Sequence, residues 1–340
     1  MKFSDTSVLT LRDIEKQQLR SSASKLGILL LLYSILFFVY VKKAFLYIYY
    51  WIVSGEVTFD AARINEYLTN KDNFSSYTAF SMLYSCCVVA VVLILTVITA
   101  RLMRIKLLGM LRLNDKRGIK SAFLSFPVVL ILNNVITTIC NYITDFFSKH
   151  GTVIPQANFS IDNPTVSAVL LEILYLIIIA PVAEEFIFRG LVLKTIAPYG
   201  KKLAIIVSAS LFGLMHGNLT QFLGAFACGI IFAAVDVKYN SIVPSIIIHM
   251  LNNTLPIMLN IGNAIESKAV TAIYFVLFYS ILLLGVFVIA RHLYSFKIQE
   301  DSHELSYSER IRTVVFNIPL LLYTAYLIYD MIFAIVAANS

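Results

Sequence analysis

The hydrophobic positions of this chain are gathered into long runs separated by short polar stretches. An α-helix needs about 20 predominantly apolar residues to cross the hydrocarbon core of a bilayer, and most of the runs approach that length. The pattern predicts an all-α, polytopic membrane helix bundle with about eight to nine transmembrane helices. The candidate helices cover residues 28–53, 79–100, 121–145, 164–183, 203–216, 220–236, 241–261, 270–292 and 316–337.

Two of these runs depart from a simple membrane span. Lys42 and Lys43 interrupt the first run. We expect either one tilted helix whose lysine side chains reach the interface, or a short span followed by an interfacial aromatic segment over residues 45–51. The run 203–216 is short for a full crossing and is interrupted by glycine. Such segments usually line a cavity, so we expect the bundle to enclose a polar intramembrane cavity.

Composition strengthens this assignment. The 340 residues are 59% apolar and only 14% charged, whereas soluble domains have about 45–50% apolar and roughly 25% charged residues. The composition therefore excludes an ordinary soluble protein and a disordered chain. We attribute the net charge of +7 to loops that face the anionic lipid of the bilayer, and we expect no nucleic acid partner. The cysteines lie inside apolar runs and predict no disulfide framework.

The positive residues predict the orientation of the chain. Lys and Arg concentrate in cytoplasmic loops of membrane proteins. Placing the N-terminus in the cytoplasm puts 21 of the 27 Lys and Arg residues on that side, in segments 1–27, 101–120, 189–202 and 291–312 and at Lys238. We therefore expect a multi-pass protein of the cell membrane with a cytoplasmic N-terminus. A signal peptide is not expected, because residues 1–27 are polar and of mixed charge.

Polar residues at membrane depth are concentrated in one part of the chain. Ionisable groups are costly there, so each one is a candidate functional residue. Residues 172–253 contain many of them, whereas the runs 79–100 and 316–337 contain almost none beyond their ends. This distribution indicates that residues 164–261 do the chemistry.

Three patterns in this region carry candidate chemistry. Residues four apart share a helix face, so Glu185 can pair with Arg189 and leave the neighbouring Glu184 free to accept a proton. A second pattern places His216 four residues after Phe212, within a Gly-x-x-x-Gly step that permits close helix packing. The third places His249 and Asn253 on one face of a later run.

These side chains suit amide hydrolysis. The reaction needs a base to activate water and donors to stabilise the oxyanion that forms. Glu184 with His216 can activate the water, and His249 with Asn253 can stabilise the oxyanion. No Ser or Cys has an adjacent base in an equivalent position, which disfavours a covalent nucleophile.

The three patterns, in this order, resemble the CPBP family of intramembrane proteases, which includes the type II CAAX prenyl endopeptidases and bacteriocin-processing and immunity proteins. The matching residues are Glu184, Glu185, Arg189, Phe212, His216, His249 and Asn253. The resemblance implies a membrane-embedded endopeptidase with Glu184, His216, His249 and Asn253 as catalytic residues, supported by Glu185, Arg189 and Phe212. It covers roughly residues 164–261.

With this resemblance we divide the chain into four parts. They are a cytoplasmic N-terminal segment (1–27), N-terminal transmembrane helices (28–162), a CPBP-like catalytic core (163–293), and a cytoplasmic loop with the final transmembrane helix (294–340). The expected substrate is a hydrophobic peptide or a membrane protein.

Three alternatives stay open. A zinc-dependent protease would use Glu184, His216 and His249 as metal ligands, whereas our preferred interpretation needs no cofactor. A non-catalytic membrane regulator or a bacteriocin immunity protein could have the same fold. A transporter is less favoured, because transporters usually contain inverted repeats and the sequence shows none.

Overall fold

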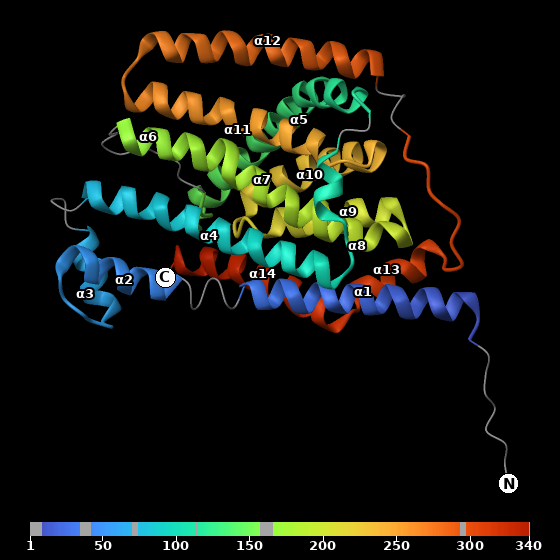
Figure 1. Ribbon diagram of the computed structural model, residues 1–340. Helices are drawn as coiled ribbons and strands as arrows, with labels where there is room; N and C mark the ends of the chain where they lie inside the picture. The colour runs from blue at the N-terminus through green and yellow to red at the C-terminus, as the bar shows by residue number, and fades with distance from the viewer. Residues whose placement is uncertain are drawn as a thin grey trace.

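The computed structural model describes residues 9–34, 42–69, 74–112, 115–156, 166–292 and 297–339. All the regular elements of these segments are helices, and the described residues contain no strand (Figure 1). The predicted all-α class is therefore confirmed. Within these described segments, five helices are long and apolar enough to cross a membrane, in Ser85–Leu102, Arg117–Lys149, Leu219–Tyr239, Lys268–Arg291 and Ile318–Ala337.

The helices follow the predicted runs closely in the middle of the chain. The first half contains α1 (Leu11–Ser34), α2 (Lys42–Ser54), α3 (Ala61–Thr69), α4 (Phe74–Leu102), the 3₁₀ turn η3 (Leu107–Leu111) and α5 (Arg117–Lys149). The second half begins with α6 (Val166–Ile173), η4 (Leu174–Ile179), α7 (Ala180–Glu185), η5 (Phe186–Leu193), α8 (Lys194–Ile196) and η6 (Ala197–Tyr199). It continues with α9 (Lys201–Leu214), α10 (Leu219–Tyr239), α11 (Val243–Ala264), α12 (Lys268–His292), α13 (Tyr307–Val315) and α14 (Ile318–Ala337).

The start of the chain differs from the prediction. Helix α1 begins at Leu11, well before the predicted start at residue 28, because Leu19, Ala23 and Leu26 form a buried stripe with helical spacing in an otherwise polar segment. The predicted run 28–53 corresponds to the end of α1 and to α2, and residues 35–41 between them lie outside the described part of the chain.

Segments from the two ends of the chain pack against each other. Helix α1 lies along α13 and α14 at one side of the bundle (Figure 1). Arg12 forms an ion pair with Glu309, and the Asn317 side chain donates a hydrogen bond to the Arg20 carbonyl oxygen at 3.1 Å. The last helix is thus part of the same packed body as the first.

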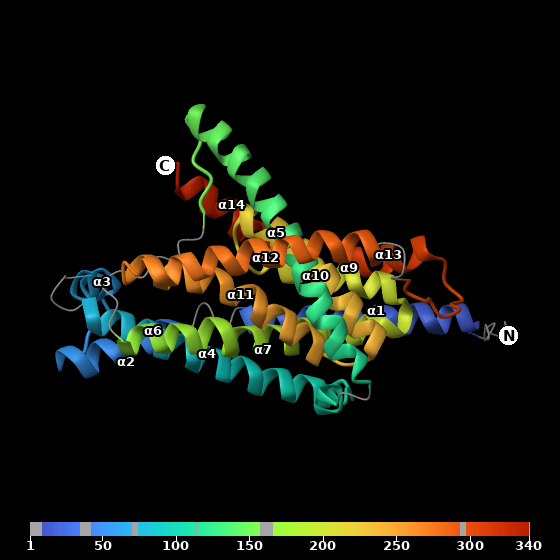
Figure 2. The ribbon, with the colours of Figure 1, turned by 90° about the horizontal axis from the view of Figure 1, so that it is seen from above.

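Helix α10 occupies the centre of the remaining bundle. It packs against α9, α5 and α11, and α12 covers α5 and α11 on the outside. Helix α5 crosses its neighbours at a steep angle, and its later half leaves the bundle (Figure 2).

One long helix is built from several pieces. Elements α6, η4, α7, η5 and α8 follow one another without a break from Val166 to Ile196, and both η4 and η5 are π-helical. The sequence predicted a membrane span that ends at residue 183 and a helical pairing of Glu185 with Arg189 beyond it. Wide π turns are often found at functional sites, and here they lie on both sides of Glu184 and Glu185.

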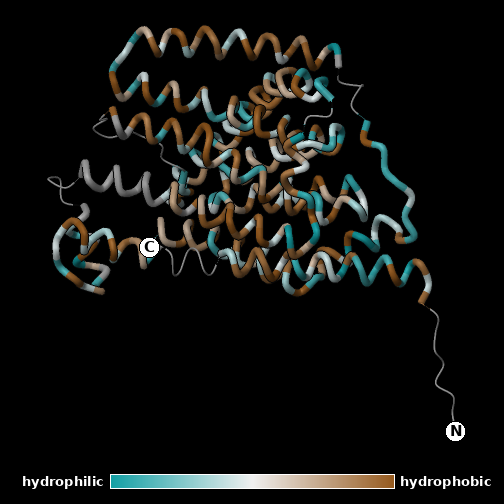
Figure 3. Tube along the Cα trace, viewed as in Figure 1, coloured by the Kyte–Doolittle hydropathy of each residue, from teal (hydrophilic) through white to brown (hydrophobic). Residues whose placement is uncertain are grey.

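The outer surface is apolar, as a lipid-facing surface requires. Hydrophobic residues dominate α12 and much of α14, whereas hydrophilic residues gather in the connection that precedes α13 (Figure 3). Leu283 on α12 and Phe333 on α14 are exposed large hydrophobic side chains. This surface supports a membrane protein, while the number of eight to nine spans stays a prediction beyond the five helices named above.

The close contact between α1 and α14 predicts the effect of one substitution. A Cβ atom at Gly27 would lie 2.7 Å from the Cα atom of Leu320 and would collide with the α14 backbone. We expect Gly27→Ala to lower the free energy of unfolding by about 1–3 kcal/mol, although alanine normally stabilises a helix interior by about 0.5–1 kcal/mol over glycine. Denaturant titration of the protein in detergent micelles measures this change.

Gly109→Ala is the matched control. A Cβ atom there would meet only the Lys106 Cβ, at an ordinary contact distance of 3.7 Å. Equal stability of the two variants would contradict the packing of α1 on α14.

Candidate functional site

The four predicted catalytic residues line one cavity. Its volume is about 510 Å³, and it lies where α5, η4, α7, α10 and α11 meet, next to the end of α9. Glu184, His216, His249 and Asn253 all contribute to its wall, together with Phe212. The structure thus brings together residues that are up to 69 positions apart in the sequence, while their chemical roles stay predictions.

Glu185 and Arg189 form the predicted ion pair behind the cavity. The Arg189 guanidinium donates to Glu185 Oε1 at 3.1 Å, and both side chains are 0% exposed. The guanidinium also donates to the Gly229 carbonyl oxygen at 3.2 Å and so ties η5 to α10. Burying two charges is costly unless they are paired and hydrogen-bonded, and these contacts provide that compensation.

Two aromatic rings enclose the arginine. The Arg189 Cζ atom lies 4.4 Å from the ring centroid of Phe212 and 5.2 Å from that of Phe232. A guanidinium at these distances is attracted to the π face of each ring. Phe212 therefore supports the ion pair as well as forming part of the cavity wall.

Glu185 also holds His249, which the sequence did not reveal. The His249 Nδ1 atom lies 2.9 Å from Glu185 Oε1. Because the carboxylate of an ion pair accepts hydrogen bonds, Nδ1 carries the proton and donates it. The His249 Nε2 atom then faces the cavity, 3.8 Å from Glu184 Oε2. One buried carboxylate thus fixes the imidazole whose other nitrogen approaches the free glutamate.

The two histidines contact the same aromatic ring. The Phe212 centroid lies 5.2 Å from that of His216 and 5.6 Å from that of His249, and both contacts are edge-to-face. His216 Nδ1 lies 2.9 Å from the Phe212 carbonyl oxygen and donates to it. The neutral ring of His216 therefore keeps an acceptor lone pair on Nε2.

Asn253 is partly engaged elsewhere. Its Nδ2 atom donates to the Leu176 carbonyl oxygen at 2.9 Å and ties α11 to the π turn η4. An amide nitrogen carries two protons, so one donor is left after this bond.

The zinc-dependent alternative makes a demand on the positions of three side chains. Zinc would need Glu184, His216 and His249 on one ion. The described residues contain no group of three His, Cys, Asp or Glu side chains spaced to hold a metal ion. The cofactor-free mechanism and the zinc-dependent one both stay predictions.

Asp236 has a structural role in the turn between α10 and α11. Its carboxylate accepts the Ser245 hydroxyl at 2.5 Å and the Ser245 backbone N–H at 3.1 Å. It is not among the residues that line the cavity. These bonds provide hydrogen-bond acceptors for Ser245 in the first turn of α11, the helix that carries His249 and Asn253.

The sequence analysis missed the contribution of α5 to the cavity. Asn133, Thr137 and Asn141 lie four residues apart and line the cavity. A polar stripe at helical spacing within an apolar run was the feature of the sequence that could have indicated this contribution. The neighbouring Asn134 instead donates to the Leu130 carbonyl oxygen of its own helix, at 2.8 Å.

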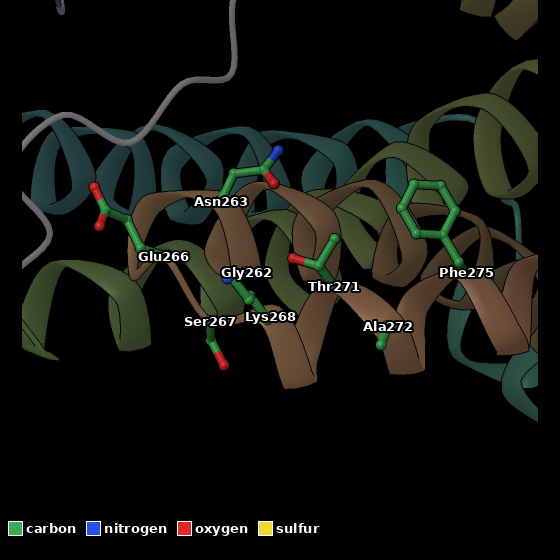
Figure 4. A pocket seen from close by; sticks show the side chains of 8 residues that line it. All are labelled: Gly262, Asn263, Glu266, Ser267, Lys268, Thr271, Ala272 and Phe275. Carbon is green, nitrogen blue, oxygen red and sulfur yellow. The ribbon is translucent and has the colours of Figure 1, made fainter.

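A second hollow lies at the connection between α11 and α12 (Figure 4). Glu266, Ser267 and Lys268 at this turn form part of its lining, and none of the predicted site residues belongs to it. The predicted chemistry therefore belongs to the first cavity.

Comparison with known families agrees with this placement. Residues 166–255 match the family described as type II CAAX prenyl endopeptidase Rce1-like. The matched segment is 90 residues long and contains all four predicted catalytic residues. The chain is thus similar to this family over about a quarter of its 340 residues. Searches of curated proteins and of solved structures found no match.

The buried ion pair predicts a large change in stability. We expect Arg189→Met to destabilise the protein by about 3–5 kcal/mol, because it leaves the Glu185 carboxylate buried with no cation from its own helix. Denaturant titration in detergent micelles measures the change.

Lys201→Met is the control for Arg189→Met, because Lys201 pairs with Asp301 at the surface. Exposed pairs contribute about 0–1 kcal/mol. A loss of similar size in the two variants would contradict the buried pair.

Proposed function

We propose that this chain is an intramembrane endopeptidase that hydrolyses a peptide bond in a hydrophobic peptide or membrane-protein substrate. The carrying observation is the contact between Glu184 and His249 at the cavity, with His249 held from behind by Glu185. A carboxylate and an oriented imidazole beside an enclosed space are the groups that hydrolysis by activated water requires. The family match at residues 166–255 supports the same activity.

In the proposed mechanism, Glu184 accepts a proton from a water molecule as the water oxygen attacks the scissile carbonyl carbon. His216 accepts a hydrogen bond from the second O–H of the same water through its Nε2 lone pair and so orients the water. Glu184 then returns the proton to the nitrogen of the leaving amine, and the C–N bond breaks. The second water proton stays on the oxygen that becomes part of the product carboxyl group, and the net reaction consumes one water.

His249 and Asn253 are proposed to stabilise the tetrahedral intermediate. Asn253 offers the Nδ2 proton that does not bond to the Leu176 carbonyl. His249 donates from Nε2 when both of its nitrogens carry protons, and the carboxylates of Glu184 and Glu185 lie close enough to balance that charge. Donors aimed at a developing oxyanion are among the largest contributions to catalysis.

The membrane orientation is part of the proposal. The Lys- and Arg-rich described segments 101–112, 115–120 and 297–312 and the first residues of α1 fall at one end of the bundle, where α1 begins and α12 ends (Figure 1). Positive residues favour the cytoplasmic side. We therefore place the N-terminus in the cytoplasm and the protein in the cell membrane.

Substitution of the proposed base tests the function. We expect Glu184→Gln to reduce kcat for a hydrophobic peptide by about 10²–10⁴-fold, because glutamine cannot accept the proton of water. Glu172→Gln, the same change on the same helix but outside the cavity lining, should keep near wild-type kcat. Cleavage by purified protein in proteoliposomes, followed by mass spectrometry of the products, measures both variants. Undiminished cleavage by Glu184→Gln would refute the proposed base.

Chelation separates the two protease mechanisms. We expect activity to persist after dialysis against a strong chelator, because the proposed mechanism uses water activated directly by Glu184. The dialysed protein is assayed for peptide cleavage, and its zinc content is measured by elemental analysis. Activity that is lost on dialysis and returns in proportion to added zinc would establish the zinc-dependent alternative.

A further inference from the structure

Helix α9 begins without a capping side chain of its own. Its N-cap residue is Gly200, which has a positive φ of 139° and offers no side chain to the free N–H groups of the first turn. The first two residues of the helix are Lys201 and Lys202. A helix N-terminus carries partial positive charge, so lysine is an unfavourable residue there. The start of α9 therefore needs acceptors and negative charge from another part of the chain.

The connection that precedes α13 supplies both. Residues 297–306 of this connection lie at the end of the bundle where α1 begins (Figure 1). The carboxylate of Glu300 accepts the backbone N–H of Lys201 at 3.1 Å and that of Lys202 at 2.6 Å. The next residue, Asp301, pairs with the Lys201 ammonium group at 3.0 Å. Because a carboxylate forms charge-assisted hydrogen bonds with the free N–H groups of a helix start, Glu300 acts as the cap of α9.

The connection is itself fixed to α1. Glu15 Oε2 accepts the backbone N–H of Glu304 at 2.8 Å and that of Leu305 at 3.1 Å. The His303 Nδ1 atom lies 3.3 Å from Glu15 Oε1, and Leu305 is buried among the hydrophobic residues of the core. The backbone that follows Glu300 is therefore held by hydrogen bonds and by burial. Glu300 thus caps α9 from a fixed support.

The other end of α9 leads into the candidate site. The helix has 14 residues, which corresponds to a length of about 21 Å. Shortly after its end, His216 donates its backbone N–H to the Gly213 carbonyl oxygen at 3.2 Å, and its Nδ1 lies 2.9 Å from the Phe212 carbonyl oxygen. The His216 ring is therefore tied to the last turn of α9. A shift of the helix along its axis would carry the imidazole away from the proposed water.

Packing and hydrogen bonds hold α9 in different ways. Its contacts with α10 and η5 determine which face of the helix turns inward. Hydrogen bonds are directional, so they also resist a small shift along the helix axis. The Ser208 hydroxyl donates one such bond to the Phe188 carbonyl oxygen at 2.8 Å, near the middle of α9. Glu300 provides two more at its start.

We infer that Glu300 is a positioning residue for the proposed hydrolysis, because by capping α9 it sets the place of His216 along the helix axis and so the orientation of the water that Glu184 activates. The inference rests on the proposed function, since it concerns the same reaction. Glu300 is not among the residues that line the cavity, and it lies outside the family match at residues 166–255. Support for the site therefore comes from a part of the chain that the family match does not cover.

Two neighbouring carboxylates allow a matched kinetic test. We expect Glu300→Ala to lower kcat for a hydrophobic peptide by about tenfold and to change KM by less than about twofold, because a small displacement of a catalytic group costs rate while the cavity that binds the peptide is kept. Asp301→Asn is the control, because Asp301 pairs with a lysine side chain at the surface, and its kcat should equal that of wild type. Equal kcat in the two variants would overturn the inference.

A second background separates positioning from a general loss of stability. In His216→Ala protein no imidazole orients the water, so the addition of Glu300→Ala should lower kcat by less than about twofold. A loss of about tenfold in both backgrounds would contradict the inference, because Glu300 would then act on the fold as a whole. Thermal melting in detergent micelles establishes that each variant is folded. If Glu300→Ala does not fold, the same comparison is made with Glu300→Gln, which keeps one acceptor oxygen.

Nitrogen NMR tests the inference without any cleavage. The His216 ring signals of ¹⁵N-histidine-labelled protein in micelles are assigned by their loss in His216→Gln. We expect Glu300→Gln to shift these signals and Asp301→Asn to leave them in place. A shift in protein that cleaves no peptide would support the link from Glu300 to His216 although the proposed function had failed. Unchanged signals in Glu300→Gln, together with cleavage that depends on Glu184, would leave the proposed function standing and remove the inference.

Discussion

The arrangement of the site depends on one buried carboxylate. Glu185 accepts a hydrogen bond from Arg189 on its own helix and another from His249 on α11. Arg189 in turn bonds to the carbonyl oxygen of Gly229 on α10. Three helices are therefore joined through a single acidic group that solvent does not reach. Such a network is stable only when its charges balance. Each of these buried charged residues must therefore lie beside its partner.

This network determines what faces the cavity. With Glu185 occupied by its partners, Glu184 is the acidic group left at the cavity, and its carboxylate meets the free nitrogen of His249. Successive residues of an α-helix point about 100° apart, so Glu185 of α7 reaches the ion pair while Glu184 lines the cavity. Phe212 contacts Arg189 and both imidazoles, so the support and the cavity wall share a side chain. The proposed hydrolysis of a peptide bond inside a membrane would need this separation between charges that are paired and a carboxylate that is available.

The sequence was informative wherever the relevant spacing was local. Spacing by four residues predicted the Glu185–Arg189 pair, and long apolar runs predicted α5, α10, α11, α12 and α14 within a few residues of their observed ends. The sequence could not predict contacts between helices, because the His249–Glu185 bond depends on how α11 lies against α7. The early start of α1 was missed because the buried stripe of a polar helix is too thin to stand out in a hydropathy pattern. The polar side chains of α5 that line the cavity were missed because an amide in an apolar run is ordinarily a contact between helices, and which face of α5 meets the cavity is a property of packing.

The tautomer of His249 is the most direct test of this account. Nitrogen NMR of ¹⁵N-histidine-labelled protein in micelles, with the His249 signals assigned by their loss in His249→Gln, reports which ring nitrogen carries the proton. The account predicts that Nδ1 is protonated and that its signal changes when Glu185 is replaced by alanine, because that carboxylate is its acceptor. A neutral ring protonated at Nε2, or an Nδ1 signal indifferent to Glu185, would contradict the central role of the buried carboxylate.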